Sequence, residues 1–350
     1  MQSEKYSRDN AGQSLKKYIL LKQGELAYNH GASKAKQFGC CYELTGPEAR
    51  IPYVYHCFKI NNHEYTPFIA MALNNAKMDK QLKRLVSSSV RMDGLLNISF
   101  EDYMSVTIHL PSPSEQKRIA DFLQKIDERI TAQEKLLASL KKYKRGVART
   151  LLTPGSCCIE GATWTTTKIG ALGSFTKGAP LSKADIAPDG TPFILYGELY
   201  TTYHEVINAV IRRTKAQPEK QYYSHVGDVI IPTSGETPEE ISTAACVMLP
   251  DIILAGDLNI FRSSKIDGRI MSYILNHIVN GQIARIAQGK SVVHIQASEL
   301  SKIEISYPDY NTQCKMISVF EAIATRIKSA ENELTYLRTM QKALLQQLFI

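Results

Sequence analysis

The chain has 350 residues, of which 44% are hydrophobic and 22% charged, which allows two domains with real cores and argues against a disordered chain. Its net charge of +8 and pI near 9.0 fit a polyanionic partner such as nucleic acid without proving one. The start MQSEKYSRDN has no apolar signal core, and no apolar run is long enough to span a membrane. The seven cysteines lack zinc-ligand spacing, and their odd number suits a reducing compartment. The sequence thus predicts a cytoplasmic protein without a membrane segment or metal site.

Residues 1–110 are predicted to form a first α+β globular domain. Its last stretch, SVTIHL (105–110), is strand-like and would be ended by Pro111 and Pro113. A long helix is then predicted over residues 111–155, capped by Ser114. The basic run KKYKRGVAR (141–149) is interpreted as a solvated helix end rather than a phosphate-binding patch.

Residues 156–308 predict a second α+β domain, and residues 309–350 a second long helix. The domain contains short β-like runs such as PFILY and DVIIP, separated by turn residues, and one helical stretch over 269–288. Both long helices carry apolar residues at alternating spacings of four and three, the a/d stripe of a coiled coil. The stripes consist of Ile119, Leu123, Ile126, Ile130, Leu137 and Leu140 in the first helix, and Phe320, Ile323, Ile327, Leu334 and Leu337 in the second.

The simplest arrangement pairs the two helices as an antiparallel coiled coil, with the equivalent residues Ile126 and Ile323 in one shared seam. Alternatively, each stripe packs on its own globular domain.

An internal repeat relates the two halves. A shift of 197 residues lays 95–152 on 292–349 without a gap, matching Pro111 with Pro308 and Gln116 with Gln313. A weaker match at a shift of 203 lays Gly24 on Gly227 and Phe58 on Phe261. The first copy has no counterpart of roughly residues 160–203, so the first domain is expected to be partial.

The block LPSPSEQKRIADFLQKID (110–127) and its echo YPDYNTQCKMISVFEAI (307–323) resemble the conserved helices of the DNA specificity subunit of type I restriction-modification systems. Pro111, Glu115 and Gln116 match the family pattern, whereas the echo has Thr312 in place of the glutamate. The opening Trp164, Lys168-Ile169-Gly170, Gly173 and the run VGDVIIPTSG (226–235) also resemble that family.

The resemblance implies two target recognition domains, each reading half of a split sequence in double-stranded DNA, with the paired helices as a ruler between them. It implies partners: methyltransferase subunits, which dock on the helices and flip out an adenine, and a restriction subunit. S-adenosylmethionine and ATP would bind those partners, and this chain would hold no cofactor. No catalytic motif is present: Walker loop, H-E-x-x-H, G-x-S-x-G and dinucleotide fingerprint are all missing from the sequence.

Three loops are candidates for DNA contacts, with an ordinary surface loop as the alternative for each. Small polar residues at a strand end allow close approach to phosphates or bases, and a lysine in a turn can reach a phosphate. The candidates are Thr233 and Ser234, with His30 as first-domain counterpart; Lys290, Ser291 and the nearby His294, with Arg91 as counterpart; and Lys177 and Lys183 around Gly178.

Three other interpretations remain open at this point. The chain could be a truncated or phase-variable silent copy that recognises one half-site only. It could be a coiled-coil scaffold that does not bind DNA. It could be an enzyme of unknown type.

Overall fold

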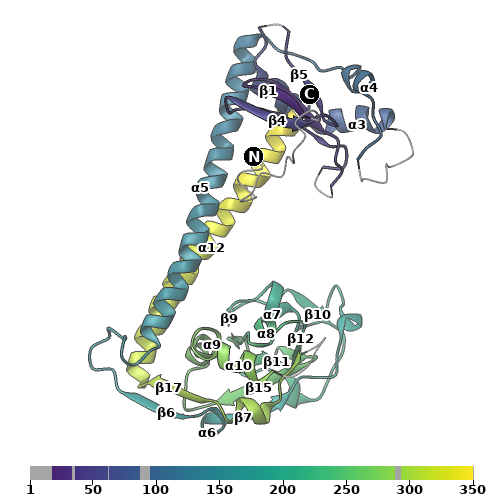
Figure 1. Ribbon diagram of the computed structural model, residues 1–350. Coiled ribbons are helices and arrows are strands. Elements are labelled where there is room, and N and C mark those ends of the chain that lie inside the picture. Colours follow the sequence, from purple (N-terminus) through teal and green to yellow (C-terminus); the bar gives the residue numbers. More distant parts are fainter. Residues whose placement is uncertain (1–17, 34–35, 62, 87–94, 288–292, 350) are drawn as a thin grey trace. The chain divides into compact units, whose positions relative to one another are not determined.

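The computed structural model describes residues 18–33, 36–61, 63–86, 95–287 and 293–349 (Figure 1). The chain divides into two compact units. Unit 1 comprises residues 1–135 and 331–350, and unit 2 comprises residues 136–330. Across the described residues, no helix combines the length and apolar character needed to cross a membrane.

Unit 1 holds small sheets, short helices and parts of the two long helices. Strands β3, β2 and β5 form an antiparallel sheet in that order, and β1 pairs with β4. The elements are β1 (Tyr18–Lys22), β2 (Leu26–Asn29), β3 (Cys40–Glu43), β4 (Glu48–Pro52), β5 (His56–Phe58), α2 (Thr66–Ala72), α3 (Ala76–Leu85), α4 (Phe100–Met104), and parts of α5 (Pro113–Leu151) and α12 (Tyr310–Leu348).

Unit 2 is built around a mixed five-stranded sheet in the order β7-β15-β11-β13-β9, with the three-stranded sheet β10-β8-β14 beside it. Its strands are β6 (Trp164–Lys168), β7 (Gly173–Lys177), β8 (Thr191–Leu195), β9 (Val206–Ile207), β10 (Arg212–Thr214), β11 (Asp228–Pro232), β12 (Ser234–Gly235), β13 (Ala245–Val247), β14 (Ile253–Ala255), β15 (Leu258–Ser263), β16 (Val293–His294) and β17 (Glu304–Pro308). Its helices are α6 (Ile169–Leu172), η2 (Lys183–Asp185), α7 (Glu198–Thr201), η3 (Lys220–Tyr222), α8 (Pro238–Ile241), α9 (Gly268–His277), α10 (Asn280–Ile286) and α11 (Ala297–Leu300).

The core of unit 2 forms where the central strand meets its helices. All five residues of β11 are buried, because a strand covered on both faces takes a continuous apolar run. Val229 and Ile231 pack in one cluster with Ile270 and Ile274 of α9. The buried Asp228 opens the strand and is held by Arg262, whose Nε and Nη2 lie 2.7 and 2.6 Å from the carboxylate oxygens.

The internal repeat is present in the strand registers. Leu26 of β2 lies opposite Phe58 and Glu43, while Val229 of β11 lies opposite Phe261 and Cys246. The counterparts Leu26 and Val229, Phe58 and Phe261, and Glu43 and Cys246 are each 203 residues apart, as the sequence predicted. Gly24 and Gly227 precede these strands with φ of +80° and +94°, a turn conformation that glycine adopts without strain.

The two long helices are 39 residues each and run side by side in opposite directions (Figure 1). In unit 1, Arg129 pairs with Glu333 at 2.9 Å and Glu134 with Arg338 at 2.6 Å. In unit 2, Ala148 and Leu151 share a core with Met316 and Phe320. The predicted α+β fold with an antiparallel helix pair is therefore confirmed.

The stripe residues face the interior to different degrees. Ile126 belongs to unit 1 and Ile323 to unit 2. The buried stripe residues are Leu123, Ile126, Ile130, Phe320, Ile327, Leu334 and Leu337. The half-buried stripe residues are Ile119, Leu137, Leu140 and Ile323.

Two local predictions around the first helix are wrong. The helix begins at Pro113, so the residue at the cap position is Ser112 rather than Ser114. The Ser112 amide and hydroxyl both donate to the Glu115 carboxylate. Residues 106–110 are not a strand, whereas their counterparts in β17 pair with β6. Among the described residues, no strand lies against 106–110, so this segment lacks the partner that makes β17 a strand.

A buried glutamine fastens each long helix to its globular domain. Gln116 Nε2 donates to the Pro111 carbonyl at 2.9 Å, and its Oε1 accepts from the Tyr65 amide at 3.0 Å. Gln313 repeats this arrangement with the Pro308 carbonyl at 2.8 Å and the Asp267 amide at 3.0 Å. The Gln that marked the repeat in the sequence is therefore a structural clamp.

Replacing Gln313 by Met should keep the volume but leave the buried Pro308 carbonyl and the half-buried Asp267 amide without this partner. We expect a loss of about 2–4 kcal/mol in unfolding free energy, measured by urea denaturation. Gln116→Met should behave alike. The control Gln124→Met, at an exposed position of α5, should stay within about 0.5 kcal/mol of the wild type. Equal midpoints for all three variants would show that the clamp is unimportant.

Candidate nucleic-acid interface

One end of the five-stranded sheet gathers several of the residues predicted to contact DNA. Lys177 ends β7 opposite Asn259 of β15, and its Nζ donates to Asn259 Oδ1 at 2.9 Å. The fully buried Asn259 in turn donates from Nδ2 to the Ile295 carbonyl at 3.3 Å. The neighbouring position must be glycine, because a Cβ at Gly178 would lie 2.6 Å from the Gly256 carbonyl oxygen. The sheet therefore holds the Lys177 amine at a fixed place on the surface.

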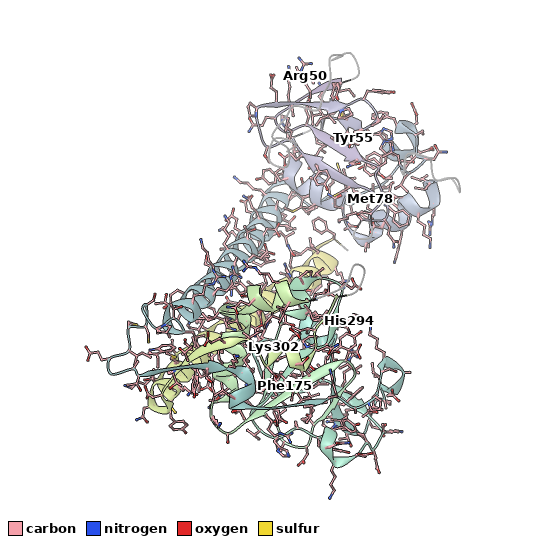
Figure 2. All side chains as sticks on the ribbon, turned by 60° about the horizontal axis from the view of Figure 1, so that its bottom comes forward. Arg50, Tyr55, Met78, Phe175, His294 and Lys302 are labelled. Carbon is pink, nitrogen blue, oxygen red and sulfur yellow. The ribbon has the colours of Figure 1, made fainter. Side chains whose placement is uncertain are left out.

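The Thr233–Ser234 segment lies at the same end. The Thr233 amide donates to the Asp257 carbonyl at 2.8 Å, and its carbonyl accepts from the Ile295 amide at 3.0 Å. Ser234 is buried, and its Oγ donates to Asp257 Oδ2 at 2.9 Å. Ser234 also pairs with His294, which is exposed on β16 (Figure 2).

Asp257, Asn259 and Tyr200 complete this site and were not predicted from the sequence. The Tyr200 hydroxyl donates to the Ser234 carbonyl at 2.6 Å, and burial, followed by the charge of Glu240, raises the pKa of Tyr200, so it remains a donor. Asp257 is exposed, and its Oδ1 makes no hydrogen bond within the described residues. Their only sequence signal was the Gly256-Asp257 turn between two strand-like runs.

This surface offers both signs of charge within one rigid frame. The Lys177 amine has three donors and gives one to Asn259, so donors remain for a phosphate or for guanine. A carboxylate such as that of Asp257 accepts from the amino group of cytosine. His294 adds an exposed ring that can donate or accept.

The other candidates are distributed differently. Lys183 is exposed at the start of η2, and none of its contacts joins it to the residues around Asp257. Lys290, Ser291 and Arg91 lie outside the described residues, so their places are predictions only.

His30 must be removed from the candidate contacts. Its side chain is only 2% exposed, and it stacks on Tyr28 and lies 4.6 Å from the ring of His56. Nδ1 lies 3.2 Å from the Leu96 carbonyl oxygen, and Nε2 contacts the Val54 carbonyl oxygen. The backbone is used in a similar way at both positions, since the His30 carbonyl accepts from the Leu96 amide and the Thr233 carbonyl from the Ile295 amide. The side chain instead joins an aromatic core with Tyr103.

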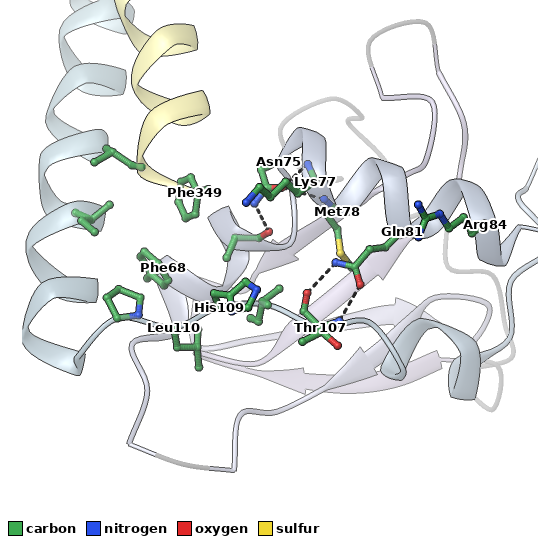
Figure 3. Close-up of a pocket in the computed structure, with 15 residues that line it drawn as sticks. Phe68, Asn75, Lys77, Met78, Gln81, Arg84, Thr107, His109, Leu110 and Phe349 are labelled. Carbon is green, nitrogen blue, oxygen red and sulfur yellow. Dashed lines mark hydrogen bonds between the residues drawn. The ribbon is translucent and has the colours of Figure 1, made fainter.

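Unit 1 also contains a cavity of about 600 Å³ between α3, the segment 107–111 and the ends of the long helices (Figure 3). Lys77, Gln81, Arg84 and His109 supply its polar lining, and Phe68 and Phe349 part of its apolar lining. In the part of the chain that the structure describes, no three His, Cys, Asp or Glu residues gather as a metal site.

The comparisons with known proteins give a family match to part of the chain and similar folds for most of it. Residues 50–142 match the family model of the type I restriction modification DNA specificity domain. This match covers the last part of the first domain and most of the first long helix. No curated protein matches the sequence.

Two solved structures share the fold of this chain. A chain described under "Structural basis underlying complex assembly and conformational transition of the type I R-M system" is 15% identical, with a TM-score of 0.60, over 96% of this chain and 84% of that chain. The type I restriction-modification S subunit from M. genitalium is 15% identical, with a TM-score of 0.57, over 96% of this chain and 85% of that chain. The matched family span contains the Ser112 cap and the Gln116 clamp.

Proposed function

We propose that this chain is a specificity subunit that directs a type I methyltransferase, and the restriction complex built on it, to a DNA sequence read mainly by residues 158–308. The family match over residues 50–142 and the shared fold support the general role, as a component that chooses DNA and catalyses no reaction itself. The observation that carries the assignment to this half is the fixed group of Lys177, Asp257 and His294 at one sheet end.

The proposal includes the partners and the place of action. Double-stranded DNA, modification subunits and a restriction subunit are the partners, and S-adenosylmethionine and ATP bind to those subunits. Action on chromosomal and incoming DNA places the complex in the cytoplasm. The proposed division of the chain is 1–110 and 156–308 for the two recognition domains, with 111–155 and 309–350 for the helices.

The first domain is proposed to contribute little sequence information. His30, which aligns with Thr233, is buried in an aromatic core, so one of its two predicted contacts is lost. This feature favours recognition dominated by one half-site. The competing outcome is a bipartite motif with an equal contribution from residues 1–108.

The decisive experiment assembles the chain with its modification subunits and maps methylated adenines by single-molecule sequencing. Exchange of residues 158–308 for those of a related subunit should rewrite the motif. If the motif instead follows residues 1–108, the assignment to the second domain is wrong. If the isolated chain transfers labelled methyl groups to DNA, the non-catalytic role is wrong.

Lys177→Ala should weaken DNA binding by the assembled complex on all sequences and reduce the slope of log K against log salt by about one unit, as expected for one lost phosphate contact. Lys265→Ala is the matched control, because Lys265 lies beyond the opposite end of β15. Thermal melting checks that both variants fold. Unchanged binding by Lys177→Ala would exclude Lys177 from the interface. Lys290→Ala is predicted to act in the same way.

A further inference from the structure

The segment 106–110 corresponds to strand β17, but no described strand pairs with it. In unit 2, β17 pairs antiparallel with β6, so that Ile305 lies opposite Thr167 and Tyr307 opposite Thr165. The shift of 197 makes Ile108 the counterpart of Ile305, and Leu110 the counterpart of Tyr307.

The two segments share their flanking bonds, which supports this register. The Val106 amide donates to the Tyr103 carbonyl, as the Ile303 amide does to the Leu300 carbonyl. At the other end, the Pro111 and Pro308 carbonyls are each held by a clamp glutamine. Residues 106–111 therefore follow the course of β17.

One edge of the segment is already occupied. Gln81 donates from Nε2 to the Thr107 carbonyl at 2.8 Å and accepts from the Thr107 amide at 3.0 Å (Figure 3). Thr107 corresponds to Glu304, whose backbone groups point away from β6 because ladder bonds alternate along a strand. The Gln81 amide thus satisfies the edge that faces away from the missing neighbour.

The opposite edge carries backbone groups that no described residue pairs with. The Ile169 amide donates to the Ile303 carbonyl, and the Asp309 amide donates to the Thr163 carbonyl, so Ile305 and Tyr307 bond to β6 as well. Within the described residues, the amides and carbonyls of their counterparts Ile108 and Leu110 make no hydrogen bond. The Leu110 side chain is 42% exposed. An open edge of this kind is a template for strand addition.

We infer that the Ile108–Leu110 edge binds an antiparallel strand from a separate polypeptide with the chemistry of Trp164–Leu172. Unit 2 identifies this occupant. There, the edge of β17 that corresponds to the Ile108–Leu110 edge is covered by β6 and the start of α6. Such a strand has three consecutive threonines after a tryptophan, followed by a lysine and the apolar Ile-Gly-Ala-Leu of α6. A second copy of this chain is a poor donor, since its own β6 is already paired with β17.

A synthetic peptide with the sequence of residues 161–173 tests the inference on the full chain. It should bind and slow amide exchange of Ile108 and Leu110 by at least about tenfold, measured by NMR at saturating peptide. N-methylation of the peptide at Thr165 and Thr167 should weaken binding by about tenfold for each lost bond. The matched control, N-methylation at Thr166, blocks an amide that faces away from the edge and should leave the affinity within about threefold.

Three results would overturn the inference: slow exchange of both amides in the free chain, no binding of the unmodified peptide, and equal binding of all N-methylated peptides. The peptide variants leave the protein unaltered, so a misfolded variant cannot produce any of these results. The DNA-recognition proposal is tested by methylation mapping, and its outcome does not depend on the result of the peptide experiment.

Discussion

Replacing Lys144 by Ala is expected to destabilise unit 2 by about 3 kcal/mol, because it breaks a buried ion pair and leaves one charge behind. Lys144 of α5 and Glu205 are each only 12% exposed, and Lys144 Nζ lies 2.5 Å from Glu205 Oε2. His277 Nε2 lies 2.8 Å from the other oxygen, Oε1. The Lys144 ammonium also lies 5.4 Å from the centre of the Tyr273 ring.

This network fixes α5 to the second domain through several layers. Tyr273 stacks on Phe320 of α12 with ring centres 4.1 Å apart, and on His277 at 5.7 Å. The Glu205 carbonyl accepts from the Cys246 amide and from Ser272 Oγ, which anchors its loop to β13 and α9. Removing Lys144 therefore loosens the helix, the loop and the sheet edge together.

The network also predicts how stability depends on pH. Burial by itself raises the pKa of Glu205, but the bond from His277 and the charge and bond of Lys144 outweigh it and lower this pKa to about 2. A lowered pKa contributes stability that is complete above the unfolded value of about 4.5 and is lost as pH falls towards 2. The stability advantage of the wild type over Glu205→Gln should therefore shrink between pH 5 and pH 2.

Urea unfolding followed by circular dichroism measures these effects. Lys142→Ala is the matched control, since Lys142 is an exposed lysine of the same helix. It should change the unfolding free energy by less than about 0.5 kcal/mol. If Lys144→Ala unfolds at the same urea concentration as Lys142→Ala, the ion pair does not hold the helix to the domain in solution.

The sequence interpretation of Lys144 failed for a physical reason. The basic run 141–149 has the composition of a solvated helix end, and three of its basic residues, Lys142, Arg145 and Arg149, are exposed. Glu205 and His277 stand far from Lys144 along the chain, and neither is marked by any local pattern. The Glu205 carboxylate reaches Lys144 of α5 only when the domain has folded.

Features that depend on periodicity or repetition were predictable. The shift of 203 gave the correct strand register for three residue pairs, because a one-residue slip would turn every side chain to the wrong face. The a/d stripe predicted the helix pair, because residues that recur in this way share one face. Both signals come from spacing along one segment or from comparison of the chain with itself. Neither depends on which distant residues meet in the fold.

The candidate interface was predictable only in part. Lys177, Thr233, Ser234 and His294 were proposed as separate loops, and the fold brings them to one end of a sheet. Asp257 and Asn259 were missed, because a turn aspartate and a strand asparagine are commonplace. His30 was misassigned, because the repeat aligned its backbone correctly but could not show that Tyr28 and His56 would enclose its ring.

Ile126→Asp is expected to have the largest effect on the helix pair. Ile126 is 6% exposed and lies between Leu123 and Ile130, which are also buried. An aspartate here loses the apolar burial and places a carboxylate where no cation is buried with it, which should cost about 4 kcal/mol. Neighbouring ion pairs such as Arg129–Glu333 lie at the exposed margin and cannot compensate.

The degree of burial also predicts an order among the variants. Ile323 occupies the equivalent repeat position but is only half-buried, so Ile323→Asp should cost less than Ile126→Asp. Phe122→Asp is the control on the same helix, because Phe122 is 49% exposed and should tolerate the charge. Urea midpoints and co-purification with the modification subunits give the readout. Equal losses for Ile126 and Ile323 would mean that the repeat symmetry, rather than antiparallel packing in two units, governs the seam. A wild-type midpoint for Ile126→Asp would mean that the stripe is open to solvent.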